Sequence, residues 1–195
     1  MKHTTSRLLF AYWDGLRRER AAPDRAEIAP GAIRHILADT FILAAEGEDR
    51  ATFRLAGTRC DALFGRRLQG TAFRDLWPAD AAAEPDKLVA TVTAETAGLV
   101  VGLLGQASFN QTLPLELLLL PLRYRGQPHV RLIGTFSPAS LPSWIGLTPI
   151  EHVETTSLRV VTIGRSGRHA GAGVAGPPQS ELRRPVLVVH EGGRR

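Results

Sequence analysis

Residues 51–78 read ATFRLAGTRCDALFGRRLQGTAFRDLWP and indicate a strand that leads into short helical pieces. The alternation of Phe53 and Leu55 with polar neighbours has the period of a β-strand and predicts that both side chains face the core. Gly65 and Gly70 then separate two short apolar pieces, each too brief for a long regular helix. The stretch contains no catalytic motif, so it predicts a fold rather than a reaction.

A longer helix and three apolar strands are expected after this stretch. Pro85 suits the first turn of a helix over 85–97, because proline lacks the amide hydrogen that would have no partner there. Strand-like apolar runs follow at 99–111, 113–122 and 127–137. Prolines near both ends of the middle run mark the ends of that strand or a sheet edge, since proline cannot donate to the ladder.

Two further elements are expected before the opening stretch. Residues 40–45 predict a strand that a polar turn joins to a second strand at 51–56. A helix is expected over 5–20, with large apolar side chains along one face. This face must be covered by the chain's own sheet or by a second chain, and we favour the sheet. The candidates for a homodimer or partner contact are Leu9, Tyr12, Trp13 and Leu16.

Together these elements predict an α+β domain with a five-stranded antiparallel sheet and helices on one face, preceded by the N-terminal helix. The concave side of the sheet and the short helices would enclose a small apolar space in which a ligand can lie. The candidates for lining this cavity or core are Leu55, Phe64, Phe73, Leu88, Val92, Leu117 and Ile133.

The chain divides into an N-terminal helical extension (1–37), the domain (38–140) and an extended C-terminal tail (141–195). The tail holds two β-like patches, SLRVVTIG and RPVLVVHEGGRR, on either side of a glycine-rich segment that is expected to be flexible. The patches can add strands, dock on the sheet edge or pair with another chain. Removal of residues 150–195 is expected to leave a folded core.

Charge and cysteine content exclude several classes of protein. The net charge of +5 comes from scattered arginine pairs without interleaved aromatic residues, so we do not expect nucleic-acid binding. No apolar run approaches the roughly 20 residues of a membrane span, and Asp14 interrupts the N-terminal run, so no signal peptide is expected. The single cysteine, Cys60, suits a reducing compartment, and we expect a cytoplasmic protein.

Motifs that would indicate a cofactor or catalysis are weak in this chain. Gly171, Gly173 and Gly176 form G-x-G-x-x-G, but Pro177 and Pro178 follow where a dinucleotide site needs the start of a helix. No metal site is expected, because the six histidines form no i,i+4 pair and one cysteine cannot build a cysteine-rich zinc site. The nucleophile-elbow motif G-x-S-x-G does not occur.

Three arginines and the single cysteine each allow a functional as well as a structural interpretation. Arg54, Arg59 and Arg66 can bind an anionic ligand at the mouth of the cavity. Arginines more often lie solvated on a strand or helix face, and we favour that interpretation. Cys60 can act as a redox switch, but a free cysteine is more often a buried apolar group, which we also favour here.

Three phrases in the chain, FRLAGT (53–58), LFGRRLQG (63–70) and FRDLWP (73–78), resemble those of stand-alone PAS-domain proteins of bacteria. The resemblance extends over residues 8–140 and includes the order of the predicted elements. It implies a non-enzymatic PAS module that acts on or beside sensor histidine kinases, with no ligand common to the group. Haem and flavin are not expected, because the long helix offers no histidine and Cys60 lies outside a flavin-adduct context.

Two functions of different classes follow from these predictions. The leading one is a non-catalytic sensory and interaction module that regulates a protein such as a sensor histidine kinase, with or without a small apolar ligand in the core. The alternative is a small-molecule receptor or enzyme that uses the same cavity.

Overall fold

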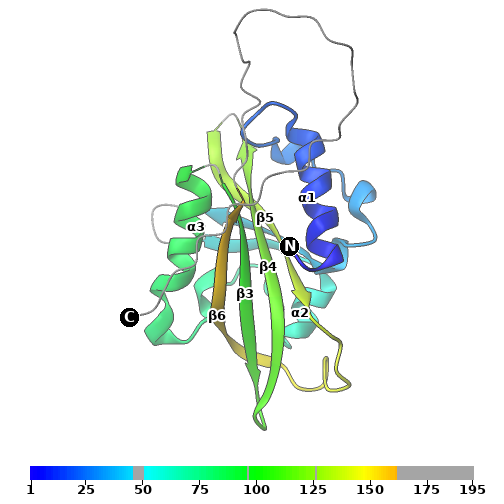
Figure 1. Ribbon diagram of the computed structural model, residues 1–195, viewed down its shortest axis with the longest axis vertical. Helices are drawn as coiled ribbons and strands as arrows, with labels where there is room; N and C mark the ends of the chain where they lie inside the picture. The colour runs from blue at the N-terminus through cyan, green and yellow to red at the C-terminus, as the bar shows by residue number, and fades with distance from the viewer. Residues whose placement is uncertain (46–50, 96, 126, 162–195) are drawn as a thin grey trace, which may run out of the picture.

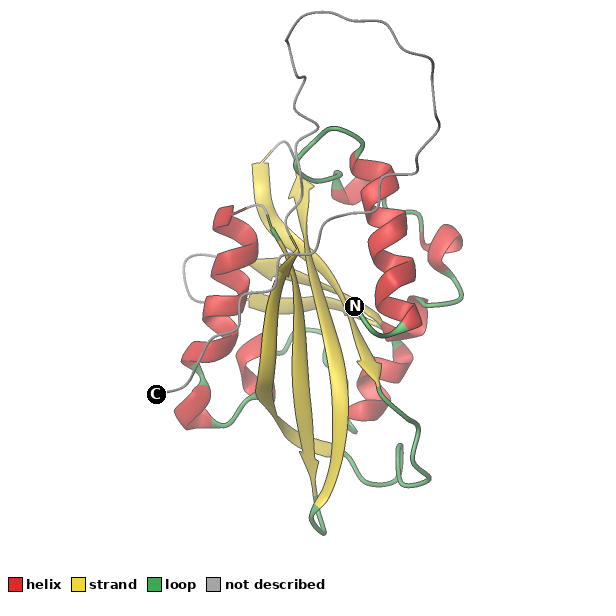
Figure 2. Ribbon diagram, viewed as in Figure 1, coloured by secondary structure: helices red, strands yellow, loops and turns green. Residues whose placement is uncertain are grey.

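The computed structural model describes residues 1–45, 51–95, 97–125 and 127–161, which form a six-stranded antiparallel sheet with helices on both faces (Figures 1 and 2). The strand order is β2-β1-β5-β4-β3-β6. Within these ranges we find no helix with the length and apolar character of a bilayer span.

The strands are β1 (Thr40–Ala45), β2 (Ala51–Ala56), β3 (Gly98–Ala107), β4 (Gln111–Tyr124), β5 (Gln127–Pro138) and β6 (Ile150–Val161). The α-helices are α1 (Thr4–Arg17), α2 (Thr58–Leu63) and α3 (Ala83–Glu95). Short 3-10 turns are η1 (Arg25–Glu27), η2 (Pro30–Ile33), η3 (Leu37–Asp39), η4 (Phe73–Leu76) and η5 (Ala79–Ala81).

The predicted α+β class is confirmed, but the number of strands was wrong. The sixth strand, β6, pairs with β3 along its whole length, from Gly98↔Val161 to Ala107↔Ile150. Without β6 the backbone of the apolar strand β3 would have an open edge, which a folded protein avoids. Of the three possibilities for the first β-like patch of the tail, the described part of that patch, residues 157–161, has the added strand. The second patch lies outside the described residues.

The apolar run of β4 is explained by burial on both faces of the sheet. Leu117 and Leu119 point to the inner face, where β4 contacts α3 and where they belong to the same buried cluster as residues of α2 and η4. Leu118 and Leu120 point to the outer face, toward the side chains of α1 and of the segment that follows it. Helices thus cover both faces, rather than the single face that was predicted, because α1 folds back over the outer one (Figure 1).

Helix α1 packs on the outer face of the sheet and is hydrogen-bonded to it. The indole Nε1 of Trp13 donates to the carbonyl oxygen of Pro121 at 2.8 Å, and both Leu9 and Trp13 are completely buried. The prediction that these two residues contact a partner was wrong, because the chain itself covers them. Tyr12 and Leu16 are partly buried and pack against the same outer core.

A buried carboxylate holds the start of α1. The side chain of Glu116 on β4 accepts from the backbone amides of Lys2 (2.7 Å) and His3 (3.2 Å), just before the helix begins. Burial raises the pKa of Glu116, but hydrogen bonds from Lys2, Ser6 and His3 together outweigh it and place the pKa below its ordinary value. Glu116 is therefore ionised at neutral pH and complements the positive end of the helix dipole.

A β-bulge in β2 places Leu55 where the sequence pattern did not. The register of β1 against β2 runs Leu43↔Phe53 and then Ile42↔Leu55, so Arg54 is the extra residue. Phe53 faces the inner core, whereas Leu55 lies opposite Ile42 and is 47% exposed. The prediction that Leu55 belongs to the inner core was wrong, because the bulge reverses the alternation after Phe53.

Candidate functional site

The space between the sheet and α2, η4 and α3 is filled by aromatic side chains. Phe41 lies between Phe136 and Phe53, with ring centroids 4.8 and 5.4 Å apart, and Phe73 continues the series to Trp77 at 5.0 Å. Because these separations are those of rings in direct contact, the aromatic residues form one packed layer.

A glycine makes the close packing of this layer possible. A Cβ at Gly134 on β5 would lie 2.5 Å from Cζ of Phe41, much closer than two carbon atoms can approach. Only glycine therefore lets the ring of Phe41 lie over β5 at this distance.

Five of the seven predicted cavity residues lie together in this inner core. They are Phe64, Phe73, Leu88, Val92 and Leu117. Ile133 is also buried, but it faces the outer core under α1, because Leu132 and Phe136 are the residues of β5 that point inward. Whether the five residues enclose a ligand stays a prediction.

The sequence reasoning missed the central rings Phe41 and Phe136. The sequence contained a pattern that indicated Phe136. This residue lies four positions after Leu132 on the same predicted strand, so the two side chains point to the same face of the sheet.

Cys60 lies completely buried in the inner core, as expected for a small apolar group. Burial raises the pKa of its thiol to about 12, and the neighbouring Asp39 adds to the effect. A thiol with this pKa is almost entirely protonated at neutral pH and is a poor nucleophile. The environment of Cys60 therefore supports a packing role.

The three arginines considered for an anion site do not lie together. Arg59 makes two hydrogen bonds of 2.6 Å to the carboxylate of Asp39, so its charge already has a partner. Arg66 donates to the carbonyl oxygen of Asp75. Arg54 also has an interaction partner, and it lines a pocket beside the outer face of the sheet, which we call the arginine pocket.

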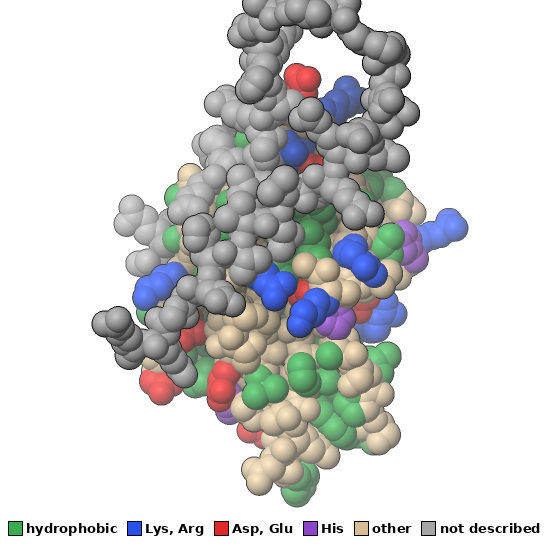
Figure 3. All heavy atoms as spheres, in the orientation of Figure 1, with side chains coloured by type: hydrophobic (Ala, Val, Ile, Leu, Met, Phe, Trp, Pro, Cys, Tyr) green, Lys and Arg blue, Asp and Glu red, His purple; other side chains and the backbone are tan. Residues whose placement is uncertain are grey.

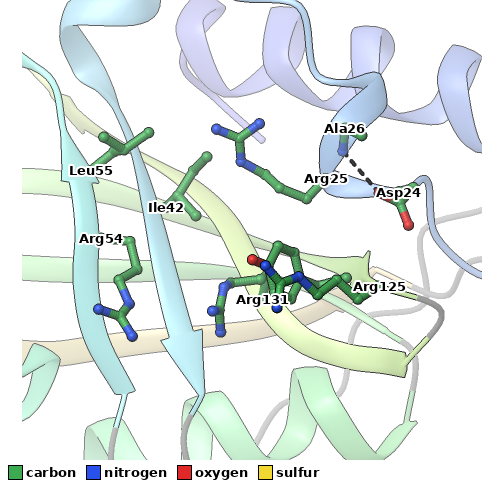
Figure 4. A pocket seen from close by; sticks show the side chains of 9 residues that line it. Asp24, Arg25, Ala26, Ile42, Arg54, Leu55, Arg125 and Arg131 are labelled. Atoms are coloured by element: carbon green, nitrogen blue, oxygen red, sulfur yellow. Dashed lines mark hydrogen bonds between the residues drawn. The ribbon is translucent and has the colours of Figure 1, made fainter.

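The arginine pocket has a volume of about 740 Å³ and is lined by η1, β1, β2 and the β4–β5 end of the sheet (Figure 4). Two guanidinium groups pack on the ring of Tyr124, with Arg131 at 4.4 Å and Arg125 at 5.2 Å from the ring centroid. Figure 4 shows Arg25 reaching from η1 toward Ile42 and Leu55. The lining residues are Asp24, Arg25, Ala26, Ile42, Arg54, Leu55, Tyr124, Arg125 and Arg131.

A second feature lies at the end of the sheet where β3 turns into β4. Phe109 at the tip of this hairpin is 89% exposed, and Leu141 and Leu147 in the segment before β6 are 72% and 85% exposed. The three residues belong to the same end, because Pro114 of β4 bonds Ala139 and Ala107 of β3 pairs with Ile150. We call this surface, defined by Phe109, Leu141 and Leu147, the hairpin end.

The face that contains the hairpin end carries both apolar and basic side chains. Figure 3 shows apolar side chains gathered over the lower part of this face, while Lys and Arg side chains gather at mid-height. A single large apolar side chain is often exposed on a protein surface. Several of them at one end of a domain indicate a surface that another molecule covers.

In the described residues there is no group of three or more His, Cys, Asp or Glu side chains arranged to hold a metal ion.

Comparison with known proteins assigns the fold. No curated protein matches the chain. A family model described as PAS domain matches residues 1–137, a range that includes α1, the first four strands and all but the last residue of β5. The match covers more than half of the sequence and agrees with the antiparallel sheet and the cluster of short helices that the structure contains. The chain therefore belongs to the PAS domain family.

Proposed function

We propose that this chain is a non-catalytic signalling module of the bacterial cytoplasm that regulates a protein partner, such as a sensor histidine kinase, through the hairpin end. Membership of the PAS family supports a sensory or interaction role in general. The finer assignment depends on what the surface of this particular chain offers.

The backbone at Phe109 is the observation that carries this proposal. Phe109 and Asn110 have φ values of 61° and 57°, in the left-handed region, within the three-residue connection between β3 and β4. Asparagine and glycine tolerate this conformation, whereas a bulky residue such as phenylalanine is strained in it. The strained side chain is also almost fully exposed, so it contributes little to the fold. Retention of strain at an exposed position is typical of a functional residue.

The packed interior supports regulation by docking rather than by a ligand in the core. Six aromatic rings occupy the space between sheet and helices, so an apolar ligand there would have to displace side chains. A partner at the hairpin end needs no such rearrangement. It would gain the burial of three large apolar side chains that now contact water.

Affinity capture with the full chain as bait tests the proposal. The test variant combines Phe109→Asn with Leu147→Ser, and the control variant is Leu8→Ser, which changes a half-exposed apolar residue on α1. We expect the wild-type chain and the control to recover the same histidine kinase from a bacterial lysate, and the test variant to lose it. Equal recovery by all three proteins would rule out the hairpin end as the docking surface.

A further inference from the structure

We infer that the outer edge of β6 pairs with the same edge of a second copy of this chain and joins the two sheets into one. This edge, which belongs to residues 150–161, is a different surface from the hairpin end, and the inference does not depend on the proposed partner. The argument rests on the open backbone of the edge and on a register in which opposite charges meet.

The two edges of the sheet differ in how their backbone is covered. At the β2 edge, the amide of Phe53 donates to the carbonyl oxygen of Thr71 at 3.0 Å, and the amide of Gly70 donates to that of Phe53 at 2.8 Å. Strand β6 lies at the opposite edge (Figure 1), and among the described residues it pairs with β3 alone. Every second residue of such a strand directs its amide and carbonyl groups away from its neighbour, so the edge is a template for an added strand.

The middle of β6 is accessible to a second strand. Thr156 and Ser157 are exposed, and Leu158 is 45% exposed although it pairs with Val101 and therefore faces the inner side. Helix α3 contacts β3, β4 and β5. Residues 150–161 are rich in β-branched side chains and contain no proline, the residue that most directly prevents pairing at an edge.

A bulge places two opposite charges of β6 on one face. The register of β6 against β3 passes over Thr156, which is therefore the extra residue of the bulge. Glu154 and Arg159 are five positions apart and would lie on opposite faces of a regular strand. Here they pair with Leu104 and Val100 of β3, which share the outer face, so both charged side chains lie on that face.

A two-fold axis through the bulge gives a self-complementary register. An axis perpendicular to the sheet keeps the outer faces of both copies on the same side. It places Glu154 of each copy opposite Arg159 of the second copy, so two ion pairs cross the interface. On the inner face it places Leu158 opposite Thr155 of the second copy, which covers an apolar side chain that is now half exposed.

Both charges of these cross-strand pairs are available. Glu154 is exposed and accepts a long hydrogen bond of 3.4 Å from Gln106. Among the described residues, neither Glu154 nor Arg159 has an ion-pair partner. Opposite charges that face each other across antiparallel strands are stabilising, whereas like charges are destabilising. This charge complementarity favours a second copy of β6 over an unrelated strand.

Sedimentation velocity of the full chain, from about 1 to 200 μM, tests the inference. We expect a dimer with a Kd of about 10–100 μM, because two paired strands bury less surface than a standard interface. Glu154→Arg and Arg159→Glu each place like charges opposite one another at two positions and should weaken the dimer by at least about 10-fold. The double variant Glu154→Arg/Arg159→Glu exchanges the charges and should restore the wild-type Kd within about 3-fold.

The control variant Glu19→Arg makes the same change of charge at an exposed position after α1 and should dimerise within about 2-fold of the wild-type chain. Thermal melts followed by circular dichroism establish that each variant is folded. A wild-type chain that stays monomeric at about 200 μM overturns the inference. Undiminished dimerisation of the folded single variants also overturns it, as does an equal loss in the control variant. A double variant that does not regain the dimer would assign the contact to another register or surface and overturn it as well.

Discussion

Replacement of Phe109 by asparagine should make the protein more stable, although it removes a large apolar side chain. Phenylalanine at a φ of 61° costs about 1–2 kcal/mol relative to an unstrained residue. Asparagine adopts the left-handed conformation at a smaller cost. Because Phe109 is 89% exposed, it buries only about 20 Å² of a surface near 200 Å², worth about 0.5 kcal/mol. The balance predicts a gain of about 0.5–1 kcal/mol in the free energy of unfolding.

Guanidinium unfolding and thermal melts measure this gain. For a chain of this size the melting temperature should rise by about 1–4 °C. The matched control is Phe109→Leu, which keeps an apolar residue with the same backbone strain and should leave the stability within about 0.5 kcal/mol of the wild-type value. A less stable Phe109→Asn protein would refute the reasoning, because it would mean that Phe109 makes contacts that outweigh its strain. An equal gain in both variants would also refute it.

Three further predictions concern the fold. The expectation that removal of residues 150–195 leaves a folded core does not hold, because these residues include β6. Truncation after Pro149 should give an aggregating chain, since it removes β6 and about 5 kcal/mol of apolar burial, whereas truncation after Val161 should leave a monodisperse core in size-exclusion chromatography. Glu116→Gln should destabilise the protein by about 1.5 kcal/mol at neutral pH in urea unfolding. Folding lowers the pKa of Glu116, so its carboxylate contributes fully to the free energy of unfolding above the unfolded pKa of 4.5. This contribution is lost as pH falls through the lower folded pKa. The stabilities of the wild-type chain and the variant should therefore become equal in acid. Cys60 should react with a thiol reagent at least about 100-fold more slowly in the native chain than in denaturant, and comparable rates would contradict its burial.

The strands and helices that follow from regular periodicity were predictable from sequence. The strands at 40–45 and 51–56 have the predicted bounds, and β3, β4 and β5 differ from the predicted runs by a few residues. The apolar stripe of α1 correctly indicated a helix that folds back on its own sheet, since Leu9 and Trp13 are buried there.

Features that depend on long-range pairing were not predictable in the same way. The bulge at Arg54 is defined by register against β1, and no local pattern in β2 reveals it. The strand β6 begins at Ile150, well before the patch that suggested it, because pairing with β3 organises a stretch rich in polar residues. The arginine pocket joins η1, β2 and the ends of β4 and β5, which are remote in sequence, so only the fold brings its residues together.

The central claim, that the hairpin end of this PAS domain regulates a protein partner, is tested most directly by a kinase assay. The histidine kinase recovered by affinity capture is purified, and its autophosphorylation rate is measured with the wild-type chain, with Phe109→Asn/Leu147→Ser and with Leu8→Ser. The account predicts that the wild-type chain and Leu8→Ser change the rate equally at the same concentration, whereas the double variant requires at least about 10-fold more protein. An unchanged rate with the wild-type chain, or an undiminished effect of the double variant, would contradict it.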